Sequence, residues 1–198
     1  MDAQRDIYDR RAREWLKREY APAITPEDQR RMKAFYLRTG RATPHLMVMG
    51  SRAGHYAFAA SEYGCRVSCV DFSLAALKVH REQWPQIYSV CADVRALPFQ
   101  LSTFDGLWTD SVLSHIPHSE FEQVALELRR ILRPGGLLSV RISVGEGMAM
   151  ENRDHGHLLR SFWRQEDIKG ALDLLDYGFS EAEPLDNKRA VLTFRREY

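Results

Sequence analysis

Short apolar runs alternate along the chain with longer segments in which apolar residues recur at helical spacing. Runs without polar alternation are typical of strands buried on both faces of a parallel sheet, and five of them predict strands at 46–49, 66–71, 87–91, 104–109 and 137–143. The intervening segments predict helices over 54–63, 73–83, 119–133 and 165–175. Strands that alternate with helices imply a parallel sheet with right-handed crossovers, so the expected class is α/β.

Local signals set the expected ends of several helices. A first helix is predicted over 2–20, and a second begins at Thr25-Pro26, where threonine can cap and proline fits the first turn. Ser73 is expected to cap the helix over 73–83, and residues 119–122 have the pattern of a capping box. Pro134-Gly135-Gly136 is expected to stop that later helix, and strands at 179–183 and 191–195 are expected to close the sheet as a pair.

Composition and charge narrow the class of protein. A chain of 198 residues, 44% of them hydrophobic, can bury one good core. The formal net charge of +1 gives no general reason for a nucleic acid or membrane partner. The charged start is not a signal peptide, and no apolar run has the roughly 18–20 residues needed to span a bilayer. Three cysteines without close pairing indicate a reducing compartment, so a cytoplasmic location is expected.

Four segments that follow predicted strands are expected to meet at one edge of the sheet. Ligands of open α/β sheets bind outside the carboxyl ends of the strands, where strand order reverses. The four segments are residues 50–54, 71–72, 93–94 and 109–115. They offer backbone N–H groups at a helix start, an acid suited to a ribose diol, a ring that can stack on a base, and an acid suited to an exocyclic amine.

The order of these pieces resembles a class I S-adenosylmethionine-dependent methyltransferase, with a further likeness at 143–163 to a small bacterial, tellurite-resistance-like branch. The stretches that carry the resemblance are GSRAGHYA, GCRVSCVDFS, CADVRALPF, STFDGLWTDSVLSHIP, RRILRPGGLLSVRI and FWRQEDIKGALDLLDYGF. It implies a Rossmann-like, doubly wound, mostly parallel seven-stranded sheet with an antiparallel C-terminal hairpin. It also implies a helical cap at 1–43 and a methyltransferase-like domain at 44–198.

The resemblance also implies roles for individual residues. Asp71 would hold the ribose hydroxyls of S-adenosyl-L-methionine, Phe72 would flank the adenine, and Asp93 with the Val94 N–H would read the adenine edge. Residues 50–54 would cradle the methionine end. The expected cofactor-binding residues are Gly50, Ser51, Arg52, Gly54, Asp71, Phe72, Asp93, Val94 and Thr109.

The glycine-bearing turn departs from the family pattern at two positions. The family usually has an acid two residues before the first glycine, where this chain has Val48, and its second glycine falls on Arg52. The lost acid removes a partner for the loop and, through it, for the cofactor's ammonium group. The guanidinium of Arg52 can pair with the cofactor carboxylate, whereas it would repel the sulfonium by up to ~4 kcal/mol at 4 Å and an effective dielectric near 20.

His115 is the candidate catalytic base, since it follows the fourth strand near the expected methyl group; the alternative is a structural histidine in the SHIPHSE turn. Tyr8, Arg13 and Trp15 can line an acceptor pocket or attach the first helix to the body, and Gly145-Glu146-Gly147 is interpreted as a lid near the acceptor. Asp154, His155 and His157 lack a second ligand cluster, so no metal is expected.

Three functions follow. The first is methyl transfer from S-adenosylmethionine to a small-molecule acceptor. The second is a methyltransferase-like protein with lost or altered cofactor binding, acting as a non-methylating partner or as the catalyst of another reaction. The third, RNA methylation, is favoured only by a basic N-terminal segment and lacks the interleaved aromatic and basic surface of single-strand binders.

Overall fold

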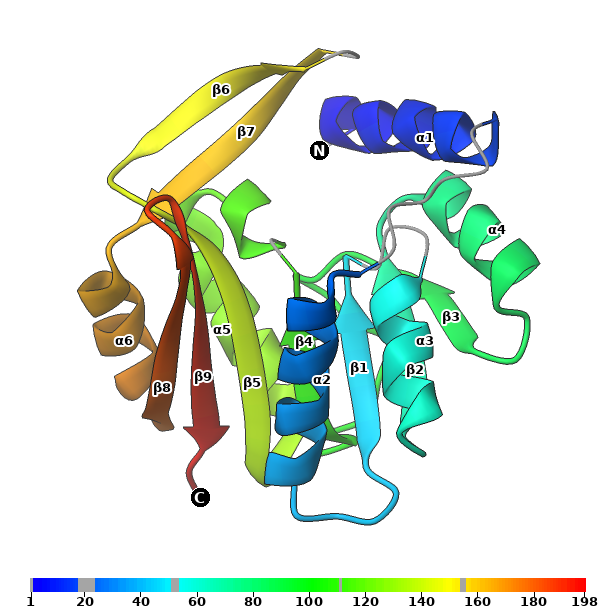
Figure 1. The fold of residues 1–198 in the computed structure, drawn as a ribbon. Helices are drawn as coiled ribbons and strands as arrows, with labels where there is room; N and C mark the ends of the chain where they lie inside the picture. Colours follow the sequence, from blue (N-terminus) through cyan, green and yellow to red (C-terminus); the bar gives the residue numbers. More distant parts are fainter. Residues whose placement is uncertain (1, 18–23, 51–53, 111, 154–155) are drawn as a thin grey trace.

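A nine-stranded sheet forms the centre of the molecule (Figure 1). The computed structural model describes residues 2–17, 24–50, 54–110, 112–153 and 156–198. Five parallel strands lie in the order β3 (Tyr88–Cys91), β2 (Arg66–Asp71), β1 (His45–Met49), β4 (Phe104–Thr109) and β5 (Leu132–Val144). β9 (Arg189–Arg196) pairs antiparallel with β5, and β8 (Tyr177–Asp186) pairs antiparallel with β9. The predicted α/β class and closing hairpin are confirmed.

The strand order reverses at β1. From β1 the chain moves outward through β2 to β3, and it then returns to the other side of β1 through β4 to β5. A ligand crevice is expected at such a reversal, beyond the carboxyl ends of the strands. Residues just after Met49, Asp71, Cys91 and Thr109 lie at this edge, because all four strands run in the same direction.

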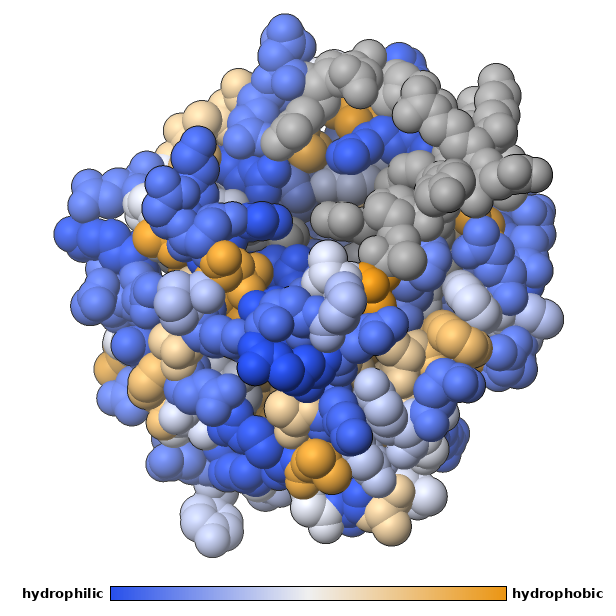
Figure 2. All heavy atoms as spheres, in the orientation of Figure 1, coloured by the Kyte–Doolittle hydropathy of each residue, from blue (hydrophilic) through white to orange (hydrophobic). Residues whose placement is uncertain are grey.

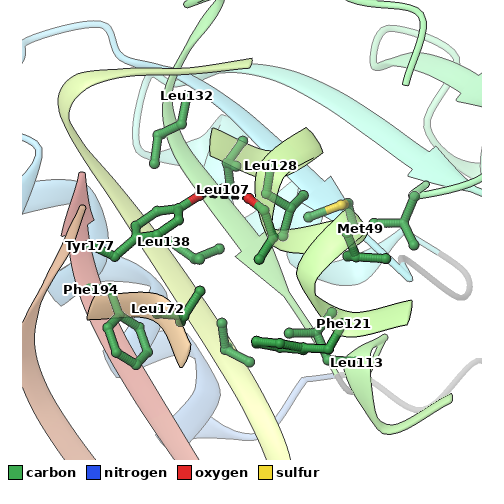
Figure 3. Close-up of a cluster of buried hydrophobic side chains, with 14 of the residues drawn as sticks. Met49, Leu107, Leu113, Phe121, Leu128, Leu132, Leu138, Leu172, Tyr177 and Phe194 are labelled. Atoms are coloured by element: carbon green, nitrogen blue, oxygen red, sulfur yellow. Dashed lines mark hydrogen bonds between the residues drawn. The ribbon is translucent and has the colours of Figure 1, made fainter. Parts of the chain in front are cut away.

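Helices cover both faces of the sheet, which explains why the strands have apolar residues at nearly every position. Leu46 and Val48 of β1 pack under α2 (Pro26–Arg38), α3 (His55–Glu62) and α4 (Leu74–Gln83). Met47 and Met49 point to the opposite layer, which holds α5 (Phe121–Ile131) and α6 (Gln165–Asp173). Figure 3 shows this second layer, in which residues of β4, β5 and β9 meet those of α5 and α6; Leu107, Leu138, Phe194, Leu128 and Leu172 are examples.

Two predicted helix caps are confirmed and one is wrong. The Thr25 side chain accepts a hydrogen bond from the Asp28 N–H, and the Ser73 side chain accepts one from the Ala76 N–H. The capping box at 119–122 does not form, because 118–120 make a 3-10 turn (η2) and α5 begins at Phe121 without a side-chain cap. The Glu120 carboxylate instead accepts a hydrogen bond from Arg95 Nη1 at 2.7 Å.

The sheet has nine strands rather than the expected seven. The two additional strands, β6 (Met148–Arg153) and β7 (Gly156–Trp163), form a hairpin that begins where β5 ends. Residues 145–147 are therefore the turn into this hairpin rather than a lid of their own. Pro134-Gly135-Gly136 is also different from the prediction, since the helix ends at Ile131 and these residues belong to β5.

The helix α1 (Asp2–Lys17) and the β6–β7 hairpin lie over the carboxyl edge of the sheet (Figure 1). α1 packs on α4 through a buried cluster of Ala12, Ala76 and Val79, and buried Ile7 lies beside Gly156 at the start of β7. On the face shown in Figure 2, apolar residues are scattered among polar ones. Within the part of the chain that the structure describes, no helix is long and apolar enough to cross a membrane.

Candidate functional site

A cavity of about 340 Å³ lies at the carboxyl edge of the sheet, beneath α1 and the β6–β7 hairpin. Its walls contain six of the residues predicted from the sequence, namely Gly50, Asp71, Phe72, Asp93, Val94 and His115. α1 adds Gln4, Tyr8 and Arg11, and later segments add Asp110, Leu158, Arg160 and Arg189. The cavity thus lies where the reversal of strand order places a ligand site.

Two glycines shape the turn after β1. Gly50 has a φ of +68°, and a Cβ there would lie 2.7 Å from Val112 Cγ2. Gly54 has a φ of +88°, and a Cβ would lie 2.2 Å from His80 Cδ2, so the start of α3 approaches α4 closely. Both positions therefore need glycine for conformation and for space. Ser51 and Arg52, which were predicted to contact the cofactor, lie outside the described residues.

Val48, at the position of the family's acid, is fully buried in the apolar layer under α2 and α3.

The end of β2 presents an acid and an aromatic ring to the cavity. Asp71 is 8% exposed, and its Oδ1 accepts a hydrogen bond from the Ser73 N–H at 2.9 Å. The Phe72 ring contacts the Tyr8 ring edge to face, with 5.3 Å between ring centroids. Helix α1 therefore lies directly over the wall that β2 provides.

The acid after β3 is held by its own neighbour. Arg95 donates from its backbone N–H and Nε to Asp93 Oδ1, each at 3.0 Å, and from Nη2 to Oδ2 at 2.7 Å. Burial of the Asp93 carboxyl favours its neutral form, but the bonds from Arg95 outweigh this effect and lower its pKa below the usual range. Asp93 is thus an ionised, fixed acceptor, and Val94 lies beside it in the cavity wall.

Thr109 does not line the cavity. Its side chain is buried at the end of β4, and Oγ1 has no hydrogen-bond partner within the described ranges. The next residue, Asp110, forms the wall at this point.

The His115 ring joins three elements. Its Nδ1 lies 2.8 Å from the carbonyl oxygen of Leu159 in β7, and its Nε2 lies 2.8 Å from the hydroxyl of Tyr8 in α1. A carbonyl only accepts, so Nδ1 carries the proton and Nε2 accepts from the tyrosine hydroxyl. Burial lowers the pKa of His115 to about 4, so the ring is neutral near pH 7. Because both nitrogens are engaged, the ring positions Tyr8 and β7 in this structure.

A buried ionic network lies behind the cavity wall. Arg141 of β5 is 3.0 Å from Asp110 Oδ1 through Nη1 and 2.5 Å from Asp28 Oδ1 through Nη2, which also donates to the Tyr56 hydroxyl at 3.2 Å. Burial disfavours charge on Arg141 and Asp28, yet their attraction outweighs it, raising the pKa of the arginine and lowering that of Asp28. Asp110 is therefore fixed from behind by a cation.

Sequence reasoning missed most of the residues that cover the cavity. Arg160 and Leu158 belong to a hairpin whose strands were not predicted, and Arg189 begins β9. Tyr8 lines the cavity, whereas the side chains of Arg13 and Trp15 are outside the described residues. Tyr8 is the residue of α1 that the sequence had identified, and Arg11 could have been found from it, because the two are three positions apart and lie on one face of a helix.

Residues 47–140 match a family model described as a methyltransferase domain. A malonyl-[acyl-carrier protein] O-methyltransferase of Salmonella typhimurium is 26% identical over 144 residues, 69% of this chain and 55% of the relative. A demethylmenaquinone methyltransferase of Renibacterium salmoninarum is 34% identical over 80 residues, 40% of this chain and 33% of the relative. The chain thus spans about half or less of the length of these curated relatives.

Solved structures share the fold at lower identity. A DhpI–S-adenosylhomocysteine complex has a TM-score of 0.77 at 18% identity, covering 99% of this chain and 96% of that one. A Burkholderia thailandensis 1,6-didemethyltoxoflavin-N1-methyltransferase has a TM-score of 0.70 at 18% identity, covering 86% and 79%. The [4+2]-cyclase SpnF has a TM-score of 0.71 at 17% identity, covering 85% and 80%, so the fold alone does not define the reaction.

The likeness to the tellurite-resistance-like branch stays a prediction. The matched segment, the strand order and the methyltransferase relatives support a class I S-adenosylmethionine-dependent methyltransferase.

Proposed function

We propose that this protein transfers the methyl group of S-adenosyl-L-methionine to a small-molecule acceptor. The observation that carries the proposal is the meeting of Gly50, the pair Asp71 and Phe72, and the pair Asp93 and Val94 on one cavity. Its volume of about 340 Å³ lies within the range of small-molecule pockets.

The residues present fit the cofactor. The side chain of Asp71, fixed by the Ser73 N–H, is suited to accept from the ribose hydroxyls. Phe72 and Val94 provide apolar contact for the adenine, and Asp93 is fixed beside them as an acceptor for its amine. Gly50 lines the cavity at the place proposed for the methionine end, where its φ of +68° and the nearby Val112 side chain require glycine.

The cofactor supplies a methyl group already activated on a sulfonium sulfur. The protein's own task is to align the acceptor and to exclude water. Tyr8 and Leu158 cover the cavity from α1 and β7, and His115 holds these two elements together through its two ring nitrogens. We assign His115 a positioning role in place of the base expected from the sequence.

The non-methylating alternative is not favoured, because the two curated relatives above are both named methyltransferases. Calorimetric titration of the purified protein with S-adenosylmethionine and S-adenosylhomocysteine tests the proposal. Binding of both, with release of S-adenosylhomocysteine when an acceptor is added, is the expected result. Absence of binding to either compound in folded protein would refute it.

A further inference from the structure

The cover of the cavity carries positive charge. Arg11 of α1 and Arg160 of β7 line the cavity from its cover, and Arg189 at the start of β9 lines it beside the end of β5. Arg160 Nη2 lies 3.2 Å from Glu151 Oε2, and Arg189 Nη2 lies 2.7 Å from Asp186 Oδ2. Among these described residues there are three arginines and two carboxylates, those of Glu151 and Asp186. One positive charge is therefore in excess.

Arg160 is more enclosed than Arg189. Its side chain is 18% exposed, whereas that of Arg189 is 54% exposed. Arg160 Nη1 donates to Ser143 Oγ at 3.2 Å, and its Nε is buried with no hydrogen-bond partner in the described parts of the chain. The buried Nε cannot reach a ligand, but Nη1 and Nη2 each keep a second N–H beyond their bonds to Ser143 and Glu151, and a guanidinium shielded from water binds an anion strongly.

Asp93 is paired with Arg95 and Asp110 with Arg141, so by the same count the strand ends keep one negative charge in excess. Asp71, Asp93 and Asp110 all lie on the wall where the cofactor is proposed to bind. An anionic ligand is therefore repelled from this wall and attracted to the arginines of the cover. The two walls divide the cavity into a cofactor side and an acceptor side.

The acceptor side offers no available base among the described residues that line it. Among the described residues of the cavity wall, His115 is the one histidine, and both of its nitrogens are engaged, by Tyr8 and by Leu159. An alcohol or an ammonium group needs a base to become a nucleophile, whereas a carboxylic acid is ionised at neutral pH without one.

From these observations we infer that the acceptor is a small-molecule monocarboxylate, held by Arg160 and methylated on oxygen. The inference rests on the proposed function. A carboxylate oxygen forms the new O–CH₃ bond as the S–CH₃ bond breaks, and the bonding electrons pass to sulfur, which becomes a neutral thioether. No proton is transferred. Arg160 is paired with Glu151, so the one excess positive charge of this group is that of Arg11; the two arginines together fit a monoanion better than a dianionic phosphate, and the neutral ester product loses its attraction to both.

The test compares octanoate, benzoate and phenylacetate with their primary amides and with octylamine and benzylamine. Binding is measured by calorimetry to the complex with S-adenosylhomocysteine. Methylation is measured with tritium-labelled S-adenosylmethionine as methanol released by base, a signature of methyl esters. We expect carboxylates to bind and to form base-labile product, and amides and amines to do neither.

Variants assign the effect to Arg160. Arg160→Gln should weaken carboxylate binding roughly 10- to 100-fold without changing cofactor affinity, and Arg160→Lys should restore part of it. Arg164→Gln is the matched control, because Arg164 is exposed and pairs with Asp167 outside the cavity. Equal carboxylate binding by Arg160→Gln and Arg164→Gln would overturn the inference.

Two further outcomes are distinguishable. Failure to bind S-adenosylmethionine would refute the proposed function and this inference with it. Normal cofactor binding, combined with no carboxylate binding up to about 10 mM or with methylation of the amines alone, would refute only the inference.

Discussion

Replacement of Arg141 by methionine should destabilise the protein strongly. The Arg141 side chain is 10% exposed and is the shared cation of Asp28, which is 11% exposed, and Asp110, which is 1% exposed. Methionine keeps much of the volume of the arginine stem, but it leaves both carboxylates buried without the guanidinium cation of Arg141. Removing one partner of a buried ion pair typically costs about 3–5 kcal/mol. For a chain of this size each kcal/mol lowers Tm by roughly 2–4 °C, so a fall of roughly 6–20 °C is expected.

Urea unfolding and calorimetry at pH 7 measure this loss. Asp28→Asn should cost less, because Arg141 retains Asp110, and the double variant should lose less than the sum of the two single variants. Arg164→Met is the control on the exposed surface, where changes are usually within roughly 0.5 kcal/mol. A loss below about 1 kcal/mol in Arg141→Met would refute the reasoning, since it would show that the two carboxylates do not need the cation.

Three further predictions concern the cavity and its support. The variant Asp71→Asn keeps an oxygen that can accept from the Ser73 N–H but loses the negative charge. We therefore expect the affinity for S-adenosylmethionine, measured by calorimetry, to fall roughly 10- to 150-fold. Unchanged affinity in folded protein would exclude Asp71 as the acid that binds the ribose. Gly54→Ala should lower the free energy of unfolding in urea by at least about 1–2 kcal/mol, because its φ is +88° and the new Cβ meets His80; an unchanged midpoint would contradict this. Burial lowers the pKa of His80 and His115 to about 4, so as the pH falls from 6.5 to 4 the unfolded chain takes up protons before the folded protein does, and the free energy of unfolding should decrease. The variant His115→Gln should make this decrease shallower, and a profile parallel to that of the unmodified protein would contradict the prediction.

The strands and helix starts could be predicted because their signals are local. The strands at 66–71 and 104–109 have the predicted bounds, and Thr25 and Ser73 cap the helices as expected. In each case the evidence lies within a few residues: an uninterrupted apolar run, or a hydroxyl just before a helix. The position of Asp71 and Asp93 at one cavity follows from the parallel direction of their strands.

The rest depends on contacts between distant residues. The β6–β7 hairpin has no continuous apolar run, and Met148 and Met150 are exposed. It is held by bonds to the segment after β4: His115 and His118 to the carbonyls of Leu159 and Phe162, and the Ser161 hydroxyl to that of Ile116. The partners of Arg141 could not be predicted from the sequence either, because Asp28 is 113 positions away along the chain. The same holds for Tyr8 and His115, which are 107 positions apart.

The small residues between α1 and α4 have a consequence for the rate of ligand exchange. The described side chains that join the two helices are Ala12, Ala76 and Val79, together with the bonds from the Ser73 hydroxyl and the Ala75 N–H to Asp9. The hairpin, in contrast, is fastened to the body at several points. Opening of α1 would also break the Tyr8–His115 bond and the Tyr8–Phe72 ring contact, so we expect this helix, rather than the hairpin, to open over the cavity at a cost of a few kcal/mol. An open form at roughly the percent level would slow ligand entry about a hundredfold relative to an uncovered site, so the rate of ligand exchange would depend on how often this helix opens.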